Sequence, residues 1–107
     1  MIKVMEGYNY DPDLEGKMYD WISSVLDHEI KYALKNNLIE TDEYGDKYIN
    51  LTEFSFGGDD SDPVIAYFYD YYEGDMEEPI GSALKILKGK NPEYADFRYD
   101  YDRHLYI

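Results

Sequence analysis

Cysteine is absent from the chain, and basic side chains are few, with 10 Lys and Arg against 24 Asp and Glu in 107 residues. Without cysteine there is no disulfide, no thiol nucleophile and no cysteine-bound zinc, a composition that fits a cytoplasmic protein. No run reaches the roughly 18 apolar residues of a membrane span. No signal-peptide pattern is expected either. The formal net charge of −14 disfavours direct binding to nucleic acid or to an anionic membrane.

Hydrophobic and aromatic residues, in contrast, are plentiful. They make up 44% and 18% of the chain, and 14 residues are tyrosine. Disordered acidic segments are poor in such side chains, so this composition predicts a folded protein. A chain of 107 residues is long enough for one hydrophobic core and too short for two. We therefore expect residues 1–107 to form a single acidic domain.

The negative charge is concentrated in the middle of the sequence. Between residues 40 and 79, thirteen acids face one base, Lys47, which gives −12 of the total −14. If this segment covered a quarter of the surface, it would carry one charge per ~130 Å², close to the ~110 Å² per charge of duplex DNA. The thirteen acids are Glu40, Asp42, Glu43, Asp46, Glu53, Asp59, Asp60, Asp62, Asp70, Glu73, Asp75, Glu77 and Glu78.

The first third of the chain predicts a long amphipathic helix. Asp11 is a typical N-cap, and Pro12 is favoured at the first helical position. From Leu14 to Ala33, apolar residues recur at spacings of three and four, which places them on one face of a helix. Asn36 and the asparagine that follows it favour a left-handed helix end.

The flanking segments predict mainly extended structure. Residues 2–10 are expected to form a short strand or an extended arm. Residues 38–56 read as a hairpin that turns around residues 44–46. Residues 57–63 are a loop by composition. The apolar, aromatic run at residues 64–72 predicts a central strand.

The last third predicts a short helix followed by a strand. Residues 73–79 are expected to form a second acidic loop, and residues 82–88 a helix. Residues 97–105 alternate apolar and polar side chains, as in a half-buried strand. The expected fold class is α+β, with one long N-terminal helix packed on an antiparallel sheet of about four strands, plus a short second helix.

Motifs for catalysis or metal binding are incomplete. His28 and Glu29 begin a zinc-protease motif, but Tyr32 stands where the second histidine belongs. Asp59, Asp60 and Asp62 lack the remaining ligand positions of a calcium loop. No glycine-rich loop has the context of a nucleotide site. We therefore expect no metal, no cofactor and no enzymatic activity.

Tyrosine alternates with acids at residues 69–73 and 99–102. Exposed tyrosine stacks on arginine, and a carboxylate pairs with it, so this pattern suits a surface for an Arg- and Lys-rich partner. The same pattern also arises when tyrosines fill the core of a small sheet and the acids face water. We favour this second reading for Tyr67, Tyr69, Tyr99 and Tyr101.

These features predict a non-enzymatic inhibitor that imitates nucleic acid. Its acidic surface would bind the basic surface of a nucleic-acid-processing enzyme or a nuclease toxin. Spread of the charge along the whole middle of the chain favours an anti-CRISPR or anti-restriction type. The residues expected to contact the partner are Glu40, Asp42, Glu43, Asp46, Asp59, Asp60, Asp62, Asp70, Tyr72, Glu73, Asp75, Glu77, Glu78, Asp100 and Asp102.

Three alternatives stay open at the level of sequence. An immunity protein that neutralises a nuclease toxin could be built with one compact acidic patch. A structural or adaptor domain would use its acidity for solubility alone, although a net charge of about 2–8 suffices for that in a small domain. A small metal-dependent hydrolase would depend on Asp60 or Asp62. The identity of the partner and the oligomeric state do not follow from the sequence.

Overall fold

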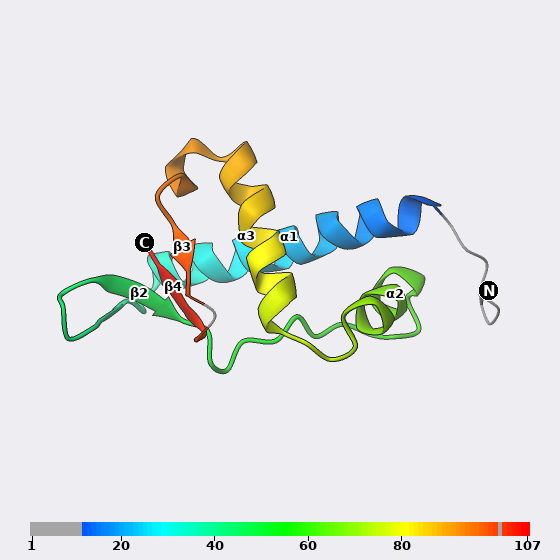
Figure 1. Cartoon of the computed structure of the whole chain (residues 1–107), viewed down its shortest axis with the longest axis horizontal. Helices are drawn as coiled ribbons and strands as arrows, with labels where there is room; N and C mark the ends of the chain where they lie inside the picture. The colour runs from blue at the N-terminus through cyan, green and yellow to red at the C-terminus, as the bar shows by residue number, and fades with distance from the viewer. Residues whose placement is uncertain (1–11, 101) are drawn as a thin grey trace.

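The computed structural model describes residues 12–100 and 102–107 and shows a mixed α+β fold (Figure 1). The predicted fold class, with four antiparallel strands, is confirmed. In chain order the elements are α1 (Pro12–Lys35), β1 (Glu40–Thr41), β2 (Lys47–Asn50), α2 (Pro63–Tyr72), α3 (Glu77–Lys90), the 3-10 helix η2 (Pro92–Tyr94), β3 (Arg98–Tyr99) and β4 (His104–Tyr106).

The long helix predicted from the apolar spacing is α1. Its buried side chains, among them Met18, Ile22 and Leu26, follow the expected three- and four-residue spacing. As predicted, the helix ends at the two asparagines that follow it, and Asn37 takes a left-handed conformation with φ 56°. The predicted N-cap, Asp11, and the predicted strand or arm at residues 2–10 lie outside the described residues.

The four strands form one antiparallel sheet in the order β1-β2-β4-β3. The predicted hairpin is confirmed, because Glu40 pairs with Tyr48 and Thr41 with Lys47 across the turn. It is shorter than expected, since β2 ends at Asn50 and no strand extends to residue 56. Pairing of β2 with β4 joins this hairpin to the C-terminal segment.

The prediction of a central strand at residues 64–72 is wrong, because this segment is helix α2. Asp62 caps the helix by accepting a hydrogen bond from the backbone N–H of Val64 at 2.8 Å, and Pro63 opens its first turn. Ile65 and Phe68 are buried three residues apart on the side that packs on α1. Tertiary packing at helical spacing therefore outweighs the β-propensity of the aromatic residues.

The boundaries of α3 also differ from the expectation. The acidic loop predicted at residues 73–79 ends early, since Glu77, Glu78 and Pro79 already belong to the helix. Carboxylates in the first turn of a helix are stabilised by its dipole, which explains why acidic residues fit there. The predicted helix at residues 82–88 is confirmed as part of the longer α3.

The C-terminal segment predicted as one strand forms two. β3 and β4 pair antiparallel, and Arg103 takes a left-handed conformation with φ 67° in the turn between them. The side chain of Asp100 accepts hydrogen bonds from the backbone N–H groups of Asp102 and His104, which holds this turn. The alternation of apolar and polar residues therefore predicts correctly that Phe97 and Leu105 are buried, but it does not predict that the chain reverses direction between them.

One hydrophobic cluster unites the described elements. Side chains of α1, α2 and α3 share it with Ile49 of β2 and Leu105 of β4. Among the described residues, no helix has both the length and the apolar character needed to cross a membrane. The two connections between β2 and α3 bury Leu51 and Phe56 in this core, while their six acidic side chains are exposed.

Candidate acidic interface

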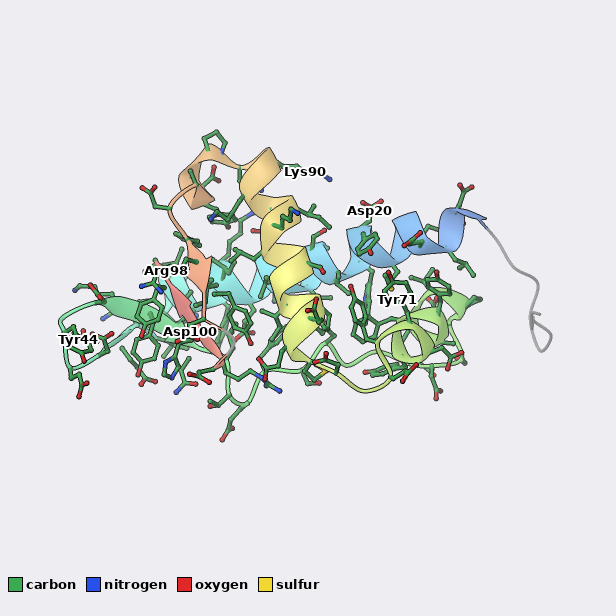
Figure 2. All side chains as sticks on the ribbon, viewed as in Figure 1. Asp20, Tyr44, Tyr71, Lys90, Arg98 and Asp100 are labelled. Atoms are coloured by element: carbon green, nitrogen blue, oxygen red, sulfur yellow. The ribbon has the colours of Figure 1, made fainter. Side chains whose placement is uncertain are left out.

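The segment that carries thirteen acids, residues 40–79, runs along one side of the molecule, and we name these acids the acidic edge. Figure 1 shows this part of the chain, coloured green to yellow, along the lower edge from the β1–β2 hairpin to the first turn of α3. All of these acids are exposed except Asp42 and Glu77, which are half-buried. Figure 2 places Asp100 on the same lower side, whereas Asp20 and Lys90 lie on the upper side.

At one end of the acidic edge, some acids of the β1–β2 hairpin accept hydrogen bonds within the protein, and others face solvent. The carboxylate of Asp42 accepts hydrogen bonds from the backbone N–H groups of Tyr44 and Asp46, both at 2.9 Å, and from the hydroxyl of Tyr106 at 3.1 Å. Although burial opposes its charged form, these bonds lower the pKa of Asp42 below its usual value. Asp42 therefore stays ionised and shapes the turn that exposes Glu43.

Between β2 and α2, the chain passes close over the helices. A Cβ atom on Gly58, which has φ 90°, would lie only 2.6 Å from Cδ1 of Ile65. This close approach fixes the position of the acids that follow. Asp59 accepts a hydrogen bond from the N–H of Ser61 at 3.0 Å, and this bond lowers its pKa. Asp60, next to it, is exposed with no side-chain partner among the described residues.

At the start of α3, the acids connect the edge to the sheet. Asp75 accepts a hydrogen bond from the N–H of Glu77 at 2.8 Å. Glu77 accepts from Nε of Arg103 at 2.6 Å and from the hydroxyl of Tyr99 at 2.5 Å. Burial opposes the charged form of Glu77, but these two partners lower its pKa overall. The neighbouring Glu78 is exposed and has no such partner.

Cations compensate few of these charges. Glu77 pairs with Arg103, and Asp100 lies 3.6 Å from Nδ1 of His104. Leaving Asp70 aside, the other acids of the edge have no basic nitrogen within 4.0 Å among the described residues. Their carboxylates either accept hydrogen bonds from backbone and hydroxyl groups or face solvent. Apart from Asp70 and Glu77, the acids of the edge thus keep a negative charge that no cation among the described residues compensates.

Tyrosines stand out from the surface near these acids. Tyr44 at the tip of the hairpin is 81% exposed, and Tyr69 and Tyr71 on α2 are 37% and 45% exposed. Tyr71 is held in place by Tyr19, with the two hydroxyl oxygens 3.3 Å apart. Tyr72, predicted to contact a partner, instead packs half-buried against the core. The exposed tyrosines of α2 are therefore Tyr71 and Tyr69, which lie one and three residues before Tyr72.

The outcome for the tyrosines expected in the core is divided. Tyr67 and Tyr99 pack against the core as expected, while Tyr69 is exposed and donates a hydrogen bond to the carbonyl of Gly57 at 2.9 Å. Tyr101 lies outside the described residues. At helical spacing, Tyr69 lies on a different side from Phe68 and Tyr72. The prediction of a strand for this segment did not give this separation. For the other exposed tyrosine, Tyr44, the turn sequence around it was the signal that could have predicted its exposure.

Within the described part of the chain, no group of three acidic, histidine or cysteine side chains is arranged to hold a metal ion. The segments that carry the predicted acids at residues 40–79 extend along the molecule in Figure 1. No protein-family model, curated protein or solved structure matches the chain.

Proposed function

We propose that this protein is a non-enzymatic inhibitor that acts in the cytoplasm by imitating nucleic acid. Its acidic edge binds the basic, nucleic-acid-binding surface of a processing enzyme, in the manner of an anti-CRISPR or anti-restriction protein. The observation that carries the proposal is the set of exposed carboxylates at Glu43, Asp60 and Glu78, for which no cationic partner lies among the described residues. A basic surface evolved to bind phosphates would supply the missing cations.

The cost of keeping these charges together supports a role in binding. Like charges on one side of a small protein repel each other and destabilise the compact state. A dozen net charges exceed the value of about 2–8 that solubility requires in a small domain. The charges are also not neutralised by lysines placed among them, since Lys47 has no carboxylate within 4.0 Å among the described residues. This arrangement favours an external partner.

Exposed tyrosines beside the acids support the same proposal. Electrostatic complementarity mainly speeds association and selects partners, whereas affinity comes from a few anchors that are well packed. Tyrosine is a frequent anchor because its rigid ring buries a large area and stacks on arginine. Tyr71 is already held by Tyr19, so its ordering on binding costs little entropy. Tyr69 and Tyr71 are therefore the proposed anchors.

The proposal is tested by binding to a panel of purified enzymes, which includes a Cas effector with its guide RNA and a restriction endonuclease. We expect a tight complex with one class, loss of its binding to DNA, and weakening of the complex at raised salt. The triple variant Glu43→Gln, Asp60→Asn, Glu73→Gln removes three exposed charges of the edge. It should lower the association rate by about tenfold or more.

A matched variant removes three charges from elsewhere. Asp20→Asn, Glu93→Gln and Asp96→Asn are also exposed, and they leave the same net charge. Under the proposal, this control binds nearly as fast as the unaltered protein. Equal loss in both triple variants would show that net charge alone matters and would contradict a specific edge. Absence of binding across the panel, with DNA processing unaffected, would refute inhibition of these enzymes.

A further inference from the structure

A pocket of about 340 Å³ lies between α3 and β3, outside the acidic edge. Leu84 and the ring of Tyr99 give it an apolar wall, and its charged lining residues are Lys85, Lys88 and Arg98. None of the described residues that line it carries a carboxylate. The volume falls within the range of about 300–1,000 Å³ that small-molecule sites occupy. In an acidic protein, this is a basic, partly apolar pocket.

The three cations of the pocket are not neutralised by the protein. Among the described residues, no carboxylate oxygen lies within 4.0 Å of Lys85, Lys88 or Arg98. Nζ of Lys88 instead donates a hydrogen bond to the carbonyl of Phe97 at 2.5 Å, and the guanidinium of Arg98 lies 4.4 Å from the centre of the Tyr106 ring. With 24 acids for 10 bases in the chain, such unpaired cations around one pocket are unexpected.

Two of the three cations, Lys85 and Lys88, come from the same side of α3. The bond to Phe97 holds Nζ of Lys88, and the guanidinium of Arg98 lies over the ring of Tyr106, but neither of these partners is among the described residues that line the pocket. Arg98 also points to the opposite face of the sheet from Tyr99, since neighbouring residues of a strand alternate. Lys85 and Lys88 lie about one turn apart on α3, so their charges repel each other, and an anion with two charges relieves that repulsion best. A phosphate monoester carries nearly two negative charges at neutral pH, whereas a carboxylate carries one.

We infer that this pocket binds a small organic phosphate, with its phosphate on Lys85 and Lys88 and a compact ring against Leu84 and Tyr99. The site differs from the proposed inhibitory surface in position, charge and ligand. Figure 2 places Arg98 on β3, away from Tyr71 on α2, although Tyr99 of the pocket donates a hydrogen bond to Glu77 of the edge. The two proposals are tested with different ligands and different variants, so the failure of one is distinguishable from the failure of the other.

The test is an NMR titration of the intact protein with adenosine monophosphate, which carries both a phosphate and a ring. We expect amide shifts confined to the residues around the pocket, on α3 and β3. Inorganic phosphate and benzoate should bind at least about threefold more weakly, since each lacks one element of the ligand. Adenosine, which lacks the phosphate, should cause little change. Equal shifts with adenosine, or none with the monophosphate, would overturn the inference.

A matched pair of variants separates the pocket from general basicity. Lys85→Gln should weaken adenosine monophosphate binding about two- to fivefold, as expected for one exposed ion pair. Lys35→Gln removes the same charge from the exposed end of α1 and should leave binding unchanged. Lys88→Gln provides a second pocket variant, and its thermal unfolding reports whether it folds. Equal weakening in Lys35→Gln, or none in either pocket variant, would contradict the proposed site.

Discussion

The acidic edge and the α3–β3 pocket carry opposite charge, yet their charged side chains are held in place in the same way. On the edge, carboxylates such as Asp42 are satisfied by backbone N–H and hydroxyl groups instead of by lysines. In the pocket, Lys88 and Arg98 are satisfied by a carbonyl and an aromatic ring instead of by acids. Both regions thus use hydrogen bonds and stacking to hold charged groups in place without neutralising them.

This comparison separates two roles of a charged side chain. Asp62 and Asp75 accept backbone hydrogen bonds at the starts of helices, so they build the fold. Asp60 and Glu43 make no such bonds in the described structure, so their removal should cost little stability. Acids of the first kind orient the edge, while acids of the second kind are available to a partner. Substitutions can distinguish the two kinds.

The largest expected effect is at Glu77, where an acid of the edge meets a cation. Glu77→Gln weakens the bonds to Arg103 and Tyr99, and we expect a loss of about 1–2 kcal/mol in the free energy of unfolding. The folded-state pKa of Glu77 lies below its ordinary value of 4.5, so its contribution is complete above that pH. The difference between the two proteins should therefore shrink as the pH falls below 4.5.

The control for this substitution is its neighbour in the chain. Glu78→Gln removes a carboxylate from the same first turn of α3, so it alters the interaction with the helix dipole in the same way. Denaturant unfolding of both variants isolates the contribution of Arg103 and Tyr99. Equal losses in the two variants, or a difference that does not depend on pH, would contradict the special role of Glu77.

A smaller effect is expected at the start of α2. Asp62→Ala removes the cap on Val64 and should cost about 1 kcal/mol, whereas Asp62→Asn keeps an accepting oxygen and should cost only a few tenths. Asp60→Ala, two residues earlier, should leave the free energy of unfolding nearly unchanged. Thermal or urea unfolding measures all three. A similar cost at both positions would erase the distinction between structural and available acids.

Much of the fold could be predicted from local patterns. The apolar spacing of α1, the hairpin and the helix near residue 82 depend on signals within a few residues of one another. The helix at residues 63–72 could not be predicted from propensity, because its aromatic residues suit a strand and only packing on α1 decides. The Asp62–Pro63 pair was the local evidence for a helix start there.

The candidate site was predictable in composition but not in detail. The concentration of charge between residues 40 and 79 is a property of the sequence, while its position along one side of the molecule is set by tertiary structure (Figure 1). Which acids accept internal hydrogen bonds depends on contacts between distant residues, such as Asp42 with Tyr106. The exposed Tyr71 likewise depends on the helix of which it is part.

The most direct test of the acidic edge is a hydrogen-exchange map of the protein in complex with an enzyme from the binding panel. We expect slower exchange in the hairpin turn around Glu43, in the chain around Asp60 and at the end of α2 near Glu73. Exchange in the second half of α3 and in β3 should be unaltered. Protection centred on α3 and β3, with the edge unchanged, would contradict the account.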